Sequence, residues 1–139
     1  MVLFLAIGIF FWEMVFLKAS FLSGDHRAQH YPWAAFYADQ IKQFCLPWWT
    51  TYFHCGFPLL AEGQVGAFYP LNFIFYYFLP LFPAYTYNIL FHYLLSALFC
   101  YGFLRALKVS EWAALFGTLI YLFGTAQGGY YYNIISLKV

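Results

Sequence analysis

Charged residues are scarce in this sequence, which has six Lys and Arg and five Asp and Glu among its 139 residues. These make up 8% of the chain, whereas roughly a quarter of a typical soluble domain is charged. The net charge of +1 offers no basic patch, which excludes nucleic acid as an expected partner. The N-terminal apolar run also lacks the basic region and the A-x-A site of a cleaved signal peptide. We therefore expect that run to be retained as a membrane anchor.

Apolar and aromatic residues are abundant instead. Hydrophobic residues make up 65% of the chain and aromatic residues 27%, with 19 Phe, 14 Tyr and 5 Trp. A soluble fold has too little interior to bury so much apolar surface. Tyr and Trp side chains favour the boundary between membrane and water, where one end of the ring is wet and the other dry. The composition predicts an all-α membrane protein.

Three segments are long and apolar enough to be predicted transmembrane helices. About 20 apolar residues at ~1.5 Å rise each cross a ~30 Å hydrocarbon core. The three spans form a single transmembrane unit over residues 1–139 and are expected at residues 2–22, 84–104 and 111 to about 127.

The positive-inside rule gives the expected orientation. Arg105 and Lys108 directly follow the second span, which marks that end as cytoplasmic. Residues 23–83 then form a long outer loop. Within the loop, residues 67–79 are apolar but too short to cross, since thirteen residues reach only about 20 Å. We interpret them as a short re-entrant or interfacial helix.

A second helix is expected in the outer loop, from Pro32 to about Phe44. Proline suits the first turn of a helix because its missing N–H needs no partner there. Apolar residues recur at helical spacing, with Asp39 among the polar residues of the other side, which predicts an amphipathic helix lying in the interface. Trp48 and Trp49 follow and are expected at the same depth.

Asp25 is the main candidate for chemistry, because it stands where the chain leaves the first span. A carboxylate at the membrane edge can act as a general base toward a hydroxyl group within hydrogen-bonding reach. The alternative is a helix cap or a hydrated loop acid. Asp39 offers a second carboxylate, although its position on a polar helix face favours simple solvation.

Histidine and cysteine residues of the outer loop leave further alternatives open. His26 and His30 are four residues apart and with His54 suggest metal handling, but a helix that begins at Pro32 leaves both in the preceding loop. We therefore assign no metal site, while a divalent metal stays open as a cofactor. Cys45 and Cys55 are either free thiols or a disulfide.

A polar stripe marks one face of the second span, where Asn88, His92 and Ser96 recur every four residues. Such a stripe is expected to face other helices. Hydrogen bonding between helices and a proton path are the two interpretations.

The outer loop resembles the first outer loop of YfhO-like bacterial membrane proteins, relatives of the GT-C glycosyltransferases. The resemblance lies in the order of short motifs: G-D, a Gln, an aromatic-Pro pair, L-P-x-W, G-x-P, a Gln and F-Y-P-x-N. The matching residues are Gly24, Asp25, Gln29, Tyr31, Pro32, Leu46, Pro47, Trp48, Gly56, Pro58, Gln64, Phe68, Tyr69, Pro70 and Asn72.

The resemblance implies part of an enzyme that transfers a sugar from a polyprenyl-phosphate donor at the outer face of a bacterial inner membrane. Asp25 would be the catalytic loop carboxylate. Because such enzymes have many more helices, the chain is expected to be an N-terminal fragment, inactive alone, that packs against lipids and the remaining helices. The alternative is a non-catalytic transport or assembly subunit. The substrate-binding residues are expected to be Arg27, Gln29, Tyr31, Trp48, Gln64 and Tyr69.

Overall fold

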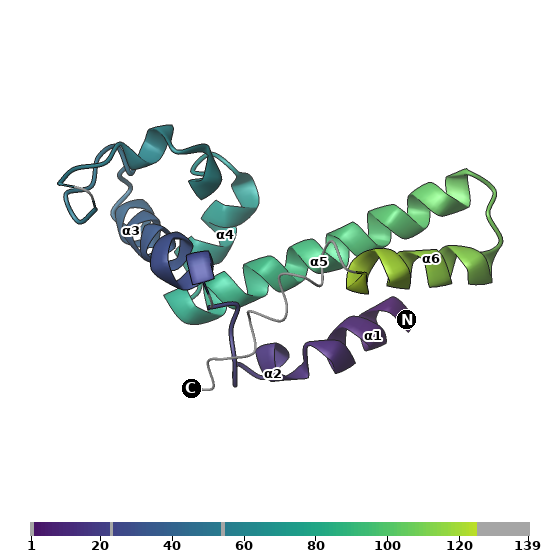
Figure 1. The fold of residues 1–139 in the computed structure, drawn as a ribbon. Helices are drawn as coiled ribbons and strands as arrows, with labels where there is room; N and C mark the ends of the chain where they lie inside the picture. The colour runs from purple at the N-terminus through teal and green to yellow at the C-terminus, as the bar shows by residue number, and fades with distance from the viewer. Residues whose placement is uncertain (1, 23, 54, 125–139) are drawn as a thin grey trace. The chain divides into compact units, whose positions relative to one another are not determined.

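A computed structural model describes residues 2–22, 24–53 and 55–124 (Figure 1). The regular elements of these residues are helices, with an isolated antiparallel bridge between Thr50 and Phe57. The predicted all-α class is therefore confirmed for the described part of the chain. The elements are α1 (Val2–Phe10), α2 (Trp12–Val15), the π-helical turn η1 (His26–His30), α3 (Tyr31–Lys42), the 3-10 turns η2 (Leu59–Ala61) and η3 (Gly63–Val65), α4 (Pro70–Phe78), α5 (Leu81–Ala106) and α6 (Glu111–Phe123).

Helix α5 contains the second predicted span and extends it at both ends. Its 26 residues measure about 39 Å at ~1.5 Å each, more than the ~30 Å hydrocarbon core. Only 11% of its most apolar 18-residue window is buried, whereas the core helix of a soluble protein is mostly buried. Among the described helices it alone is long and apolar enough to cross a membrane.

The first predicted span, residues 2–22, is wrong as a single helix. The chain is helical from Val2, changes geometry at Phe11 and leaves the helix after Val15. Even as one continuous helix, residues 2–15 would reach only about 21 Å, which is short of a span. Leu17, the second residue after α2, stops the helix, since its φ of 55° places it in the left-handed region.

The same termination ends three helices of this chain. After Leu17, the amide N–H of Lys18 donates to the Glu13 carbonyl at 2.7 Å, and the N–H of Leu17 itself donates to the Met14 carbonyl. This pair of bonds is a Schellman motif, which usually has glycine at the left-handed position. Phe44 after α3 and Lys108 after α5 hold the corresponding positions, with φ of 58° and 61°. Non-glycine residues therefore stop all three helices.

Helix α6 begins at Glu111, the residue at which the third predicted span was expected to start; Ser110 holds the N-cap position, and its side chain makes no capping hydrogen bond. It has 13 described residues, or about 20 Å, so the third predicted span is not confirmed, and residues 125–127 of that prediction lie outside the described residues. The face of α6 that is buried carries Ala114, Thr118 and Leu122. The small side chain of Ala114 on this face leaves room for a neighbouring helix.

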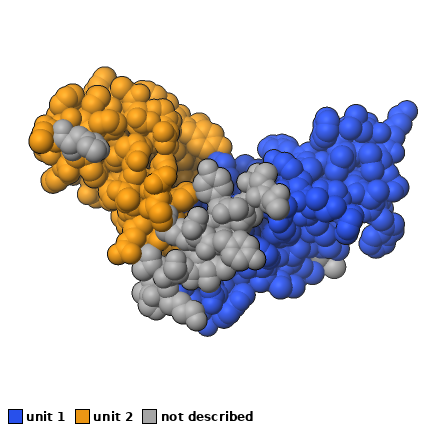
Figure 2. Space-filling model, in the orientation of Figure 1, with its two compact units in different colours: residues 1–19, 89–139 blue, residues 20–88 orange. Residues whose placement is uncertain are grey.

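The described chain divides into two units, coloured separately in Figure 2. Unit 1 contains residues 1–19 and 89–139. Its helices meet through aromatic rings: the centroids of Phe10 and Phe123 are 4.5 Å apart, and those of Phe11 and Tyr93 are 5.2 Å apart. Ring contacts of this kind add to the burial of apolar area in holding helices together.

Unit 2 contains residues 20–88 and has α3 at its centre. Helix α3 packs on α4 and on the turn η3, and the rings of Tyr37 and Tyr76 meet edge to face at 5.7 Å. The predicted helix after Pro32 is confirmed, but its apolar stripe is covered by protein and does not face lipid. The buried residues of the stripe are Trp33, Ala34, Tyr37, Ala38 and Ile41.

The short helix expected within residues 67–79 is confirmed as α4. Its nine residues measure about 14 Å, too short to cross a bilayer. Pro70 stands in its first turn, where the missing N–H of proline is harmless.

Candidate functional site at the start of helix α3

The ionisable residues near Asp25 lie on a π-helical turn that runs directly into α3. Pro32 stands in the first turn of α3 and has no N–H to donate, so the ladder of hydrogen bonds cannot continue unchanged through it. The wider turn η1 precedes it, closed by Tyr31 N–H donating to the His26 carbonyl. The expectation that a helix starting at Pro32 leaves the histidines in a loop is therefore wrong. The ring centroids of His26 and His30 are 5.3 Å apart.

Asp25 occupies the N-cap position of η1, and its carboxylate makes no capping hydrogen bond. Of the alternatives for this residue, the helix cap is therefore wrong. The side chain is exposed, so water or a ligand can reach the carboxylate. Its charge acts on the neighbouring imidazole of His26, whose cationic form it favours.

His26 joins η1 to the first turns of α5. Its Nδ1 lies 2.7 Å from the hydroxyl oxygen of Tyr85, and the tautomer of the imidazole decides which group donates. Burial lowers the pKa of His26 from its ordinary value of 6.5, and the nearby His30 lowers it further, while Asp25 acts in the opposite direction. The neutral imidazole is therefore the form that the folded protein favours.

This lowered pKa predicts a pH-dependent stability. The unfolded chain binds a proton on His26 more readily than the folded chain, so the contribution to the free energy of unfolding is complete above pH 6.5 and falls as the pH drops below it. We expect the unfolding midpoint in detergent micelles to fall less between pH 7.5 and 5.5 for His26→Gln than for the parent. An equal fall of the unfolding midpoint in the two proteins would contradict the assignment to His26.

Three of the predicted substrate-binding residues share this turn with Asp25 or follow it directly. Arg27 is exposed and Gln29 is half-buried. Tyr31 packs its ring against Tyr85, with centroids 5.3 Å apart, and burial raises the pKa of its phenol. One turn thus presents a carboxylate, a guanidinium and an amide next to two phenols.

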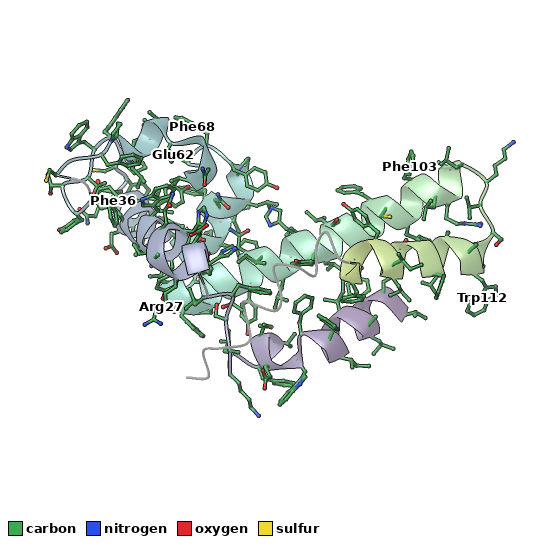
Figure 3. The ribbon with its side chains drawn as sticks, viewed as in Figure 1. Arg27, Phe36, Glu62, Phe68, Phe103 and Trp112 are labelled. Carbon is green, nitrogen blue, oxygen red and sulfur yellow. The ribbon has the colours of Figure 1, made fainter. Side chains whose placement is uncertain are left out.

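The other three predicted binding residues belong to separate segments of unit 2. Trp48 lies in the loop after α3, Gln64 in η3, and Tyr69 just before α4, and all three are exposed. In Figure 3, Glu62, two residues before Gln64, lies on the opposite side of unit 2 from Arg27. The turn at Asp25 and the η3 segment therefore belong to different surfaces.

Sequence reasoning missed the structural role of Asn72. Its side-chain amide donates to the carbonyls of Val65 and Gly66, both at 3.1 Å, and its oxygen accepts from Asn88 at 2.7 Å. Gly66 has a φ of 60°, and a Cβ there would lie 2.7 Å from the Asn72 amide nitrogen. The signal was the pairing of a glycine with an asparagine six residues later.

The polar stripe on α5 is divided between two kinds of contact. Asn88 is buried and bonds Asn72, whereas Ser96 donates to the Tyr121 hydroxyl of α6 at 3.4 Å. Nearer the start of the helix, Thr86 shares a 2.6 Å hydrogen bond with Ser20. Hydrogen bonds between segments therefore account for much of the stripe.

The described residues give little support for metal binding. No group of three His, Cys, Asp or Glu side chains there is arranged to hold an ion. Cys45 and Cys55 are exposed free thiols, so the disulfide alternative is wrong, and His54 lies outside the described residues.

Unit 1 contains a separate hollow of about 280 Å³ between α1, α5 and α6. Its walls are mainly apolar, and Tyr101 and Glu111 supply its polar groups. Mainly apolar walls suit a hydrocarbon chain.

Comparisons with protein-family models, with curated proteins and with solved structures find no match to this chain.

Proposed function

We propose that the chain is part of a membrane glycosyltransferase of the YfhO-like kind, which transfers a sugar from a polyprenyl-phosphate donor at the outer face. The observation that carries this proposal is the exposed Asp25 carboxylate on the same turn as Arg27. Sugar transfer from a phosphate carrier uses a base, which accepts the proton of the acceptor hydroxyl, and a cation, which binds the phosphate.

The two residues would act at opposite ends of the reaction. The acceptor hydroxyl attacks the anomeric carbon, and its proton passes to the Asp25 carboxylate. The bond between that carbon and the carrier phosphate breaks, and the electron pair leaves with the phosphate. Arg27 would stabilise the phosphate through charge-assisted hydrogen bonds. Gln29 and Tyr31 would bind the sugar, with Trp48, Gln64 and Tyr69 contacting more distant parts of the donor or acceptor.

The proposed location is a bacterial inner membrane, with α5 crossing it and residues 23–83 outside. Support comes from Arg105 in the last turn of α5 and from Lys108 just beyond it, because cations gather on the cytoplasmic side. Helices α1 and α6 would lie in the same membrane, against lipid or further helices. Their exposed apolar side chains include Phe4, Leu5, Ile9, Phe10, Phe116 and Ile120.

The test is Asp25→Asn, made in the protein expressed from its complete coding sequence. Loss of the base should lower the rate of sugar transfer by roughly 100-fold or more, measured with a labelled polyprenyl-phosphate sugar in membrane vesicles. Asp39→Asn is the matched control, because Asp39 is an exposed carboxylate on α3 outside the proposed site. An Asp25 variant as active as the Asp39 variant would remove Asp25 from the mechanism.

A non-catalytic transport or assembly subunit is the second candidate. It is favoured by the structural roles of two motif residues, Asn72 and Gly56. The Asn72 side chain holds the turn at Val65, and Gly56 is covered by the ring of Trp49. A motif whose residues serve folding needs no catalytic role to account for it. Absence of transfer activity in the parent protein, with Asp25→Asn assembling normally, would support this candidate.

A further inference from the structure

The loop that follows α3 exposes large aromatic side chains and has no charge. Residues 44–53, FCLPWWTTYF, contain no Asp, Glu, Lys, Arg or His, and we name them the aromatic loop. Relative exposures are 81% for Phe44, 67% for Trp48, 58% for Trp49 and 81% for Tyr52. Two indoles and a phenol are therefore held outward from unit 2.

The exposure is held in place by the rest of unit 2. Thr50 and Phe57 exchange two backbone hydrogen bonds, of 2.9 and 2.8 Å, and Thr50 itself is buried. Phe57 stacks on Trp33 of α3, with centroids 5.6 Å apart and planes 10° from parallel. A Cβ at Gly56 would lie 2.6 Å from the ring of Trp49, so that indole rests against the backbone of the hairpin. The end of the loop is thus anchored to α3 through Phe57 and Trp33.

The aromatic loop begins beside the start of the membrane-length helix. The ring of Phe44 lies 5.8 Å from that of Tyr77 in α4, and Lys42 Nζ donates to the Leu79 carbonyl at 3.4 Å. Leu79 is two residues before α5 begins at Leu81. A bilayer crossed by α5 would therefore lie close to the aromatic loop.

We propose that the aromatic loop inserts into the headgroup layer of a phospholipid bilayer, with the indoles of Trp48 and Trp49 as its anchors. Indole and phenol rings favour that layer because each has an apolar body and one polar group. The absence of charge in the loop removes the cost of moving ions out of water. The amphipathic helix α3 cannot serve this purpose, since its apolar stripe is buried. The proposal requires that α5 crosses a membrane and does not require sugar transfer.

The first test places Trp48 in depth. The full chain, with Trp12, Trp33, Trp49 and Trp112 replaced by Phe, is reconstituted into phosphatidylcholine vesicles in which the lipid carries bromine at a chosen position. We expect bromine near the headgroups to quench Trp48 emission roughly twofold more than bromine at the chain ends. The matched control retains Trp33 in place of Trp48, and its buried indole should be quenched little by either lipid.

Two outcomes overturn the proposal. Strong quenching of Trp48 by aqueous acrylamide, without quenching by bromine, would show a loop in water. Protection from both quenchers would show a protein partner or a second copy of the chain on the loop.

A second measurement avoids the four substitutions. Cys45 is an exposed thiol within the loop, so a nitroxide can be attached there after Cys55→Ser and Cys100→Ala. We expect the nitroxide in phosphatidylcholine vesicles to be relaxed more by dissolved oxygen than by a water-soluble nickel complex. The opposite order would overturn the proposal even if the single-tryptophan protein does not fold.

Discussion

Replacing Asn72 with leucine is expected to lower the free energy of unfolding by about 1–3 kcal/mol, because the half-buried groups bonded to Asn72 lose their hydrogen-bond partner. The asparagine amide donates to Val65 and Gly66, and its oxygen accepts from Asn88. Leucine has the same branched arrangement of side-chain heavy atoms but makes none of these three bonds. Thermal unfolding in detergent micelles, followed by circular dichroism, measures the loss.

Gln64→Leu is the matched control for this substitution. Gln64 lies in the same turn, but its side chain is exposed, so the expected change is within about 0.5 kcal/mol. If the Asn72 and Gln64 variants unfold together at the parent's midpoint, the turn at residues 63–66 does not depend on Asn72.

Replacing Gly56 with valine is expected to lower the free energy of unfolding by about 3 kcal/mol and to release Trp49. Gly56 has a φ of 130°, a conformation that residues with a Cβ rarely adopt, and the new Cβ would meet the Trp49 ring at 2.6 Å. Either the ring moves or the hairpin opens. Faster exchange of the Thr50 and Phe57 amide protons, which bond across the hairpin, measures the opening.

Gly63→Val provides the comparison, since a Cβ at Gly63 meets nothing within 4 Å and its φ is not in the left-handed region. Its effect should be within about 0.5 kcal/mol, as for an ordinary surface substitution. Unchanged amide exchange at Thr50 and Phe57 in the Gly56 variant would show that the hairpin tolerates the added side chain.

Helices with a simple apolar pattern were predicted well from sequence. The second predicted span, residues 84–104, lies wholly within α5, and α3 begins within one residue of Pro32. In both cases a local property is enough: a continuous apolar run in one, and a proline that fits only the first turn in the other. The general class of the fold followed from these signals.

The end of the first helix was not predicted from sequence. Leu17 ends the first helical segment, although nothing in the run of residues 2–22 marks a stop. A leucine in the left-handed region costs about 1 kcal/mol, so it is found there only when contacts elsewhere outweigh that cost. The sequence around Leu17 contains no glycine that would mark the stop.

The candidate site was predicted in part. The sequence identified the cluster around Asp25, and the structure places Arg27 and Gln29 on the same turn. The hydrogen bond between His26 and Tyr85 joins residues 59 positions apart, and no local pattern connects them. Trp48, Gln64 and Tyr69 were assigned by their order along the chain, which says nothing about whether they face Asp25.

By itself, the sequence determined the all-helical class of the described residues and the position of the membrane-length helix α5, because composition and periodicity act within each segment. It also predicted two further spans, residues 2–22 and 111 to about 127, which the structure does not confirm. Only the tertiary structure decided what covers each apolar face. The stripe on α3 was predicted to meet lipid and instead meets α4, while Phe44, Trp48, Trp49 and Tyr52 of the uncharged loop after α3 are exposed. The physical reason is that a hydrophobic pattern specifies a face that avoids water, and either lipid or protein can shield that face.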